Sequence, residues 1–315
     1  MLWLLNLGFT LSWLFYKKRY AAISGVSALL TIPFLLRILT FSVPSNEPGE
    51  LKIMSYNVKN FDLYNWSENM KTREKMFDLI EDEHPDLLCI QEFYNDTFEF
   101  KNLSLLKNRL SVKYHHYLQT TYLTDHKRPR SWGLITFSKH KIINKGSIDF
   151  DNSVNNSCMF SDVIIHEDTV RVYNMHLQSI HLGEEEYKTI DDIAESQNTT
   201  MNRVTHLLKK MKRAYIKRSK QVDKIAESVQ RCPYKVILLG DFNDIPISYS
   251  YQKLSKNLED AFISKGNGIG ETFTGKLPYF RIDYIFVDPS IQIKKYYSIP
   301  KNLSDHYPIV AEVNI

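Results

Sequence analysis

VILLGDFNDIP, residues 236–246, is an apolar run that ends at Gly240 and passes straight into a burst of short polar side chains. An apolar run of this length that stops at a glycine predicts a buried strand that delivers its last residues to a site. Asp241 and Asn243 are two residues apart, so their side chains point the same way if the strand continues. An Asx-type turn, which Asp and Asn also favour, explains the stretch equally well without any function.

The composition allows a large folded domain and gives little sign of nucleic-acid binding. The chain has 315 residues, 43% of them hydrophobic, which is enough for one large domain or two ordinary ones. Its formal net charge is +4, and half of that excess lies in residues 1–50. In the remaining residues the basic and acidic side chains nearly balance, which does not indicate a nucleic-acid binder. Cys89, Cys158 and Cys232 are too widely spaced for a metal motif or a disulfide framework.

Residues 1–43 are predicted to form a membrane anchor of one or two helices. Residues 1–16 carry no charge, the basic cluster at 17–19 follows, and 20–43 is apolar apart from a few hydroxyls and Arg37. The second stretch is long enough to cross a hydrocarbon core of about 30 Å, whereas the first is slightly short. The basic cluster favours the cytoplasmic face, so the bulk of the protein is predicted outside the cytoplasm. A cleaved signal peptide is the alternative, although no charged region precedes the apolar stretch.

The rest of the chain alternates strand and helix patterns after a short linker at residues 44–50. This alternation predicts a layered α/β domain over residues 51–315. Strands are expected at 51–58, 86–91, 132–138, 170–177, 236–241, 281–287 and 308–313, and helices at 72–83, at 249–258 and over most of 184–231.

The long segment 184–231 combines an apolar stripe with many basic side chains. Val222 and Ile225 continue a stripe at helical spacing that starts near Val204. One interpretation of the basic side chains is a contact for an anionic substrate. The solvated face of an amphipathic helix is the simpler interpretation, and the spacing favours it. The basic residues are Lys209, Lys210, Lys212, Arg213, Lys217, Arg218 and Lys220.

Nearly every predicted core strand ends in an acid, an amide or an imidazole. Each such residue has an ordinary explanation as a turn residue or a structural histidine. Asp283 is harder to explain, because it interrupts an apolar strand and a buried carboxylate needs a partner. The strand-end residues are Asn57, Glu92, His176, Asp241, Asn243, Asp283, Asp305 and His306.

These residue types limit the chemistry of the predicted site. Carboxylates with amides bind a hard cation such as Mg²⁺ through oxygen. The His and Cys residues are too scattered for a zinc site, and neither a Walker loop nor a GxSxG elbow occurs in the sequence. A hard cation with a histidine that an aspartate orients suits attack by water on a phosphoester.

Seven short blocks occur in sequence along the chain: SYNVKNF at 55–61, IQE at 90–92, GLITFSK at 133–139, YNMHLQS at 173–179, GDFND at 240–244, RIDYIF at 281–286 and SDHYPI at 304–309. In this order they resemble the endonuclease/exonuclease/phosphatase superfamily of Mg²⁺-dependent phosphoesterases. The likeness covers residues 51–315 and implies a four-layer α/β/β/α sandwich of two mainly antiparallel sheets, preceded here by a membrane anchor. Each block is weak alone, and the seven in order are specific.

The resemblance also implies a role for each matching residue. Glu92, helped by Asn57, would bind Mg²⁺, with Mn²⁺ as the alternative ion. Asp283 would pair with and orient His306, and either His306 or Asp241 would deprotonate the attacking water. The remaining matches imply a phosphate contact from Asn243, a transition-state donor in His176 and a carboxylate near the metal in Asp305, whereas Asp244 has no part beyond the turn.

Two classes of function remain open on the sequence alone. The first is a membrane-anchored phosphoester hydrolase whose substrate is nucleic acid, phospholipid or a small phosphoester. The second is a membrane-tethered binding or scaffold protein that has this fold without activity. The near-neutral domain argues mildly against tight duplex binding, because each phosphate contact usually needs a Lys or Arg. Protein partners and oligomeric state are not indicated.

Overall fold

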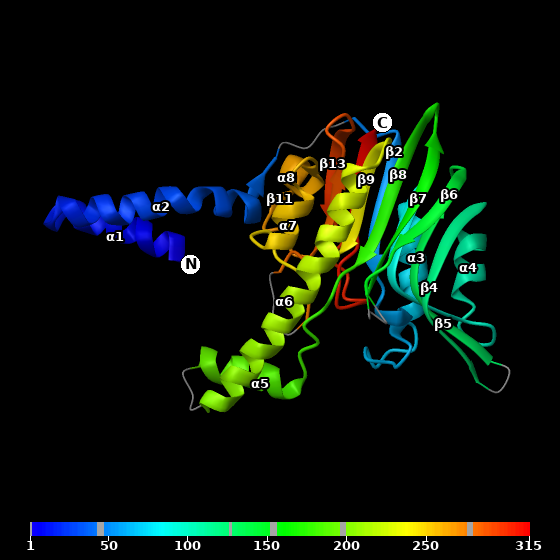
Figure 1. Cartoon of the computed structure of the whole chain (residues 1–315), viewed down its shortest axis with the longest axis horizontal. Helices are drawn as coiled ribbons and strands as arrows, with labels where there is room; N and C mark the ends of the chain where they lie inside the picture. Colours follow the sequence, from blue (N-terminus) through cyan, green and yellow to red (C-terminus); the bar gives the residue numbers. More distant parts are fainter. Residues whose placement is uncertain (1, 43–46, 126–127, 152–155, 196–199, 276–279) are drawn as a thin grey trace.

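The computed structural model describes residues 2–42, 47–125, 128–151, 156–195, 200–275 and 280–315. Two six-stranded sheets pack face to face, and helices cover the outer face of each (Figure 1). The four-layer α/β/β/α sandwich predicted from the resemblance is therefore confirmed. A pair of helices at the N-terminus projects away from the sandwich (Figure 1).

The first sheet has the strand order β13-β14-β2-β3-β5-β4. Only β2 and β3 run parallel in it, and the other neighbours are antiparallel. Helices α3 and α4 cover its outer face through an apolar cluster. The bounds are β2 (Leu51–Asn57), β3 (Leu87–Asp96), β4 (Tyr114–Asp125), β5 (Arg128–Ser138), β13 (Gln292–Ser298), β14 (Ile309–Asn314), α3 (Thr72–Glu83) and α4 (Asn102–Arg109).

The second sheet has the order β10-β12-β9-β8-β7-β6, and only β8 and β9 are parallel neighbours. Helices α6 and α7 pack on its outer face. Its bounds are β6 (Ile142–Ile148), β7 (Ser157–Ile165), β8 (Asp168–His176), β9 (Lys235–Asp241), β10 (Glu259–Asp260), β12 (Asp283–Val287), α6 (Met201–Gln230), α7 (Tyr249–Leu254) and α8 (Ala261–Lys265).

The main core lies between the two sheets. Alternate side chains of β2, including Leu51 and Ile53, face Ile237 and Leu239 of β9 in one buried cluster. Cys89 lies in this cluster as a buried small hydrophobe. Because strand residues alternate between faces, the remaining apolar residues of the same strands bury against the helices. This explains the near-continuous apolar runs in the sequence.

The apolar runs correctly predicted β2, β3, β5, β8, β9, β12 and β14. They missed strands that lie toward the sheet edges, although one of these, β7, is buried along most of its length. The structure adds β4, β6, β7 and β13, which the sequence patterns did not indicate. β4 and β13 are edge strands with several polar side chains, and β6 is the exposed edge of the second sheet. An edge strand needs less apolar surface, so it gives a weaker pattern.

Two helices form the N-terminal end, α1 (Leu2–Tyr16) and α2 (Lys18–Ile38). Among the described residues, α2 is the one helix whose length and composition allow it to cross a membrane. It ends earlier than the apolar stretch, because β1 (Thr40–Phe41) pairs with β11 (Asn267–Gly268) of the domain. The guanidinium of Arg281 also donates to the carbonyl of Arg37 at 3.0 Å. Residues 43–46, which include part of the predicted linker, lie outside the described residues.

Candidate functional site

The neighbouring strands β8, β9 and β12 bring three predicted site residues to one end of the second sheet. His176 pairs in register with Asp241 across the parallel β8–β9 ladder, and Asp283 pairs with Asp241 across the antiparallel β9–β12 ladder. Gly240 has φ +132°, and a Cβ there would lie 2.1 Å from the carbonyl oxygen of Met175. Only glycine therefore lets β9 approach β8 this closely at the site.

The facing sheet supplies the opposite wall of the same site. Asn57 ends β2, and Glu92 lies in the adjacent β3, at an irregularity in its pairing with β5 between Ile90 and Phe93. Glu92 has φ +50° and Asn243 has φ +51°. Such conformations are uncommon for residues other than glycine and occur often at functional sites. Here the irregularity turns the Glu92 side chain out of the core, where 31% of it is exposed.

The Asp241 carboxylate is the centre of the contacts between these residues. The amide nitrogen of Asn57 donates to Asp241 Oδ2 at 3.0 Å and to Glu92 Oε1 at 3.2 Å. His176 Nε2 and His306 Nε2 each lie 3.6 Å from Asp241 Oδ2. The backbone N–H of Asn243 donates to Asp241 Oδ1 at 2.8 Å. Asp241 is 1% exposed, so it lies beneath the more open Glu92.

Two further predicted residues complete this set from the loop before β14. His306 Nδ1 lies 2.9 Å from Asp283 Oδ2, which is the partner that the buried Asp283 required. Asp305 forms an ion pair with Lys59 at 2.9 Å. All eight predicted site residues thus lie at one end of the sandwich. We call them the strand-end cluster: Asn57, Glu92, His176, Asp241, Asn243, Asp283, Asp305 and His306.

Burial and the crowding of carboxylates shift the pKa values within the strand-end cluster. Burial lowers the pKa of His306, but the attraction of Asp283 and Asp241 outweighs it and raises the pKa to about 10. Burial raises the pKa of Asp283 to about 6 against the opposing pull of His306. The pKa of Asp305 is lowered, because His306 and Lys59 outweigh the effect of burial. His306 is therefore held as an imidazolium at neutral pH.

The donor atoms of the strand-end cluster fit a hard divalent cation. Glu92 and Asp241 are carboxylates that share the Asn57 amide, with Glu92 open to solvent on one side. Oxygen ligands with an open side suit Mg²⁺, which keeps several of its waters. A second close group, Asp241, Asp283 and His306, is fully buried, and there His306 is already hydrogen-bonded to Asp283. Because of its openness, we regard the Glu92 side as the better metal position.

The side-chain amides of two predicted residues, Asn57 and Asn243, are not oriented as their expected roles require. Asn57 directs its amide nitrogen to Glu92, and its oxygen accepts from the backbone N–H of Lys59 at 3.1 Å. The Asn243 amide nitrogen donates to the carbonyl of Leu177 at 3.0 Å and to Asp241 at 3.2 Å. Both amides therefore orient Asp241 in this structure. The metal contact of Asn57 and the phosphate contact of Asn243 stay predictions.

Two hollows meet at the strand-end cluster, and Glu92, His176, His181 and Asp305 line both. The first, which we call the apolar groove, has a volume of about 370 Å³. Its apolar lining is Ile180, Leu182, Tyr187, Ile190, Met211, Tyr215, Ile245, Phe273, Phe280 and Ile282. The second, which we call the aromatic groove, has a volume of about 520 Å³ and is lined by Lys59, Asn60, Tyr64, Trp66, Thr120, Thr121, Leu123, Trp132 and Gly133.

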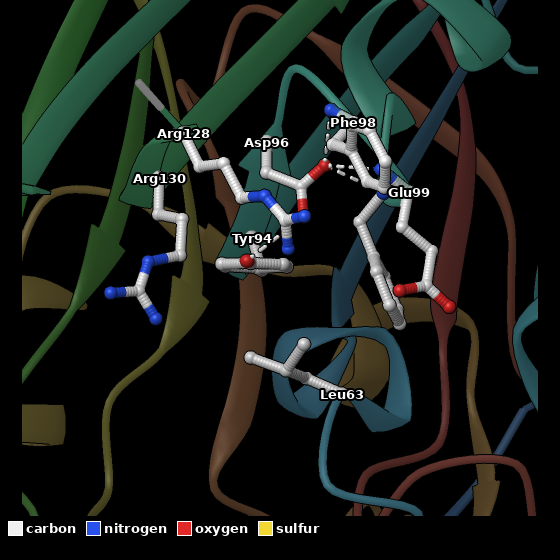
Figure 2. A pocket seen from close by; sticks show the side chains of 8 residues that line it. Leu63, Tyr94, Asp96, Phe98, Glu99, Arg128 and Arg130 are labelled. Carbon is white, nitrogen blue, oxygen red and sulfur yellow. Dashed lines mark hydrogen bonds between the residues drawn. The ribbon is translucent and has the colours of Figure 1, made fainter. Parts of the chain in front are cut away.

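A third hollow of about 500 Å³ lies beyond the aromatic groove (Figure 2). Tyr94 lines it and packs against Trp132 of the aromatic groove, with ring centroids 5.0 Å apart. The guanidinium of Arg128 lies over the Phe98 ring at 4.4 Å. The Asp96 carboxylate accepts backbone hydrogen bonds from the turn that carries Phe98 (Figure 2). Several side chains that line this third hollow thus contact one another, and none of its lining residues belongs to the strand-end cluster.

The structure corrects two expectations about residues near Asn243. Arg218 belongs to the basic run that was expected on a solvated face, yet it is fully buried. Its guanidinium lies 2.9 Å from Asp244, which therefore has a role beyond the turn. Arg218 lies four residues before Val222 on the apolar stripe of α6, so helical spacing was a signal for its burial. The pair fixes α6 against the end of β9.

Three other residues of the site were missed by the sequence analysis. His181 lines both grooves, and burial lowers its pKa, so it is neutral at neutral pH. Lys59 supplies the cation beside Asp305. Thr272 accepts from the backbone N–H of Asp283 at 3.1 Å and helps to hold that carboxylate in place. Lys59 lies within the SYNVKNF block, whereas His181 and Thr272 lie outside the matching blocks and carry no local signal.

The fold and the site together define a class of protein, and comparison with known proteins agrees. The family model described as Endonuclease/Exonuclease/phosphatase family matches residues 54–306. The chain belongs to this family, as the seven sequence blocks predicted. A search of curated proteins found no significant match.

Many solved structures share the fold at low sequence identity. A family member from Bacteroides vulgatus has 16% identity and a TM-score of 0.60, with 84% of this chain and 98% of that chain covered. The human Nocturnin catalytic domain with bound sulfate has 17% identity and a TM-score of 0.60, with 85% and 95% covered. The mannosyl-6-phosphatase of Bacteroides thetaiotaomicron has 19% identity and a TM-score of 0.55, with 84% and 99% covered. These likenesses concern the fold alone.

Proposed function

We propose that the protein hydrolyses phosphoester bonds with a divalent metal ion, Mg²⁺ by preference, and that the strand-end cluster is its catalytic centre. The observation that carries the proposal is the position of Asp241. One buried carboxylate lies within 3.6 Å of two imidazoles and within hydrogen-bonding distance of two amides. A structural role alone does not require so many polar groups at the meeting point of two grooves.

Each residue of the strand-end cluster that contacts Asp241 has its own role in the proposed hydrolysis. Asp241 holds the attacking water and accepts its proton, while Asn57 and Asn243 fix the direction of the carboxylate. The water oxygen forms a bond to phosphorus, one P–O ester bond breaks, and the departing alcohol takes up a proton from solvent. A hard cation on the Glu92 side would take up negative charge that develops on the phosphate oxygens.

His306 serves as a donor in this scheme. With its pKa raised to about 10, its imidazolium does not accept a proton from water at neutral pH. This supports Asp241 as the proton acceptor, a choice that the sequence left open. His306, oriented by Asp283, then donates from Nε2 to a phosphate oxygen, and His176 donates from the other side of Asp241.

We also propose that the hydrolase is anchored in a membrane with its domain outside the cytoplasm. Helix α2 has the length and composition of a membrane span, and the basic residues 17–19 precede or begin it. Basic residues favour the cytoplasmic face, which leaves the domain on the other side. A reporter that is active only in the cytoplasm, fused at the C-terminus, is expected to stay silent. An active reporter would show that the domain lies in the cytoplasm.

The test of the proposed function is a substrate panel with the full-length protein in detergent. The panel contains bis-(p-nitrophenyl) phosphate, p-nitrophenyl phosphate, single- and double-stranded DNA, and sphingomyelin. Each is assayed with Mg²⁺, with Mn²⁺ and with EDTA. We expect turnover of at least one substrate with metal and none with EDTA. If no substrate shows metal-dependent turnover, the protein is better explained as a binding protein with this fold.

A further inference from the structure

The two grooves meet at one catalytic centre and are otherwise lined by different residues, and this arrangement bears on the substrate. Glu92, His176, His181 and Asp305 line both grooves. A phosphorus atom bound at the strand-end cluster therefore has room for one substituent in each groove. A phosphomonoester has a single substituent and would leave one groove without an occupant, whereas a phosphodiester fills both.

The apolar groove is unsuited to a charged or strongly polar substituent. Helices α5 (Glu184–Ala194) and α6 extend beyond the site end of the sheets (Figure 1) and supply much of one wall. Tyr187 and Ile190 come from α5, and Met211 and Tyr215 from α6. No Lys or Arg is present among the described residues that line this groove. A hydrocarbon chain of several methylenes matches this lining, because its burial there removes apolar surface from water.

The aromatic groove has a different character and suits a polar alcohol. Lys59 Nζ lies 5.0 Å from the centroid of the Trp66 ring and forms the ion pair with Asp305. Trp132 and Thr121 line the same groove. Aromatic rings with hydroxyl and ammonium groups bind hydroxylated alcohols through stacking and hydrogen bonds. The two substituents of the substrate would therefore differ in polarity.

We propose that the substrate is a phosphodiester with one long apolar chain, as in a phospholipid, and one polar alcohol. This inference rests on the proposed function and narrows it. The chain lies in the apolar groove against α5 and α6, and the polar alcohol lies in the aromatic groove. Water attacks phosphorus, the P–O bond to one alcohol breaks, and the products are that alcohol and a phosphomonoester.

A nucleic acid fits the two grooves less well. Its strand continues on both sides of the scissile bond, so the next phosphate would enter the apolar groove. That phosphate would meet no Lys or Arg among the described lining residues there, although phosphate contacts normally use one of these side chains. Single-stranded DNA is therefore expected to be turned over poorly, and it serves as a comparison in the test.

The test compares two soluble diesters with the same leaving group, p-nitrophenyl ethyl phosphate and p-nitrophenyl octyl phosphate. Both are assayed below micelle-forming concentrations with the full-length protein and Mg²⁺. Each buried methylene is worth about fourfold in affinity, so we expect kcat/KM to be at least tenfold higher for the octyl ester. Equal values for the two esters, or faster turnover of single-stranded DNA than of the octyl ester, would overturn the inference. If no diester is turned over while p-nitrophenyl phosphate is hydrolysed with Mg²⁺, the inference fails and the proposed function stands. If neither is hydrolysed, and no other substrate of the panel is, the proposed function itself is contradicted.

A pair of matched variants locates the chain in the groove. Met211→Gln replaces a half-buried side chain of the apolar groove by a polar one of similar length. Met201→Gln makes the same replacement on α6 at a side chain that is 77% exposed and lines no described groove. We expect Met211→Gln to reduce the octyl-to-ethyl ratio at least threefold and Met201→Gln to leave it unchanged. An unchanged ratio in Met211→Gln would refute the assigned place of the chain.

Discussion

The buried pair of Arg218 and Asp244 offers a prediction whose magnitude follows from the structure. The Arg218 guanidinium lies 2.9 Å from Asp244 Oδ2, and the two side chains are 1% and 7% exposed. Arg218 Nε also donates to the carbonyl of Gln178 at 2.9 Å. Replacement of Arg218 by Met removes both contacts. Among the described residues, the remaining side-chain partner of Asp244 is then Ser250, whose hydroxyl donates to Asp244 Oδ2 at 2.7 Å.

An unpaired buried carboxylate is costly. Breaking a buried ion pair by removal of one partner typically costs about 3–5 kcal/mol of the free energy of unfolding. Domains of this size lose roughly 2–4 °C of melting temperature for each kcal/mol, so Arg218→Met should melt about 10 °C lower. Addition of Asp244→Asn removes the stranded charge and keeps an oxygen for Ser250. The double variant should therefore be more stable than Arg218→Met alone.

The assay is urea unfolding of the full-length protein in detergent at 25 °C, followed by tryptophan fluorescence. Arg213→Met is the control, because Arg213 is exposed on the same helix. It should change the free energy of unfolding by less than about 0.5 kcal/mol. A loss below about 1 kcal/mol in Arg218→Met, or no recovery in the double variant, would refute the assignment of Arg218 and Asp244 as a buried ion pair.

Three further predictions concern the strand-end cluster. Asp283→Asn should lower kcat/KM by about 10²–10⁴-fold with little change in KM, because it removes the group that orients His306; wild-type activity would show that the pair is only structural. In the wild-type protein kcat/KM should fall as the pH rises toward about 10, because His306 then loses the proton that it donates. A fall of kcat/KM that already occurs near pH 6.5 would contradict the raised pKa of His306. In a thermal scan, Mg²⁺ at a hundred times its dissociation constant should add about 2.7 kcal/mol to the free energy of unfolding. The substitution Glu92→Gln should abolish this gain. An equal gain in Glu92→Gln would exclude Glu92 as the Mg²⁺ ligand.

The sequence revealed the residues of the site more fully than its surroundings. Short polar side chains at the ends of apolar runs stand out, so Asp241, His176 and Asp283 were found from local patterns, and the order of the blocks linked them. Their contacts depend on register between strands far apart in the chain, which no local pattern encodes. That the Asn243 amide faces Asp241 rather than an open groove is such a detail.

The surrounding elements were harder to predict for physical reasons. The edge strand β4 carries mixed polar and apolar side chains over Tyr114–Asp125, so it lacks a clear period. Arg218 was misassigned because a basic residue is normally exposed, and only its partner Asp244 on another element makes its burial favourable. The two grooves come from loops and helices that meet only in the folded chain, so their contrast in polarity was not foreseen.

Asp241 is the proposed proton acceptor in the metal-dependent hydrolysis of phosphoesters. The most direct test is kcat/KM for bis-(p-nitrophenyl) phosphate with Mg²⁺ in Asp241→Asn, with Asp168→Asn as the control at the far end of the β8 ladder. We expect a loss of at least about 10²-fold in Asp241→Asn and a value within twofold of the wild-type protein in Asp168→Asn. Activity of Asp241→Asn within tenfold of the wild-type protein would contradict the assignment of Asp241 as the proton acceptor.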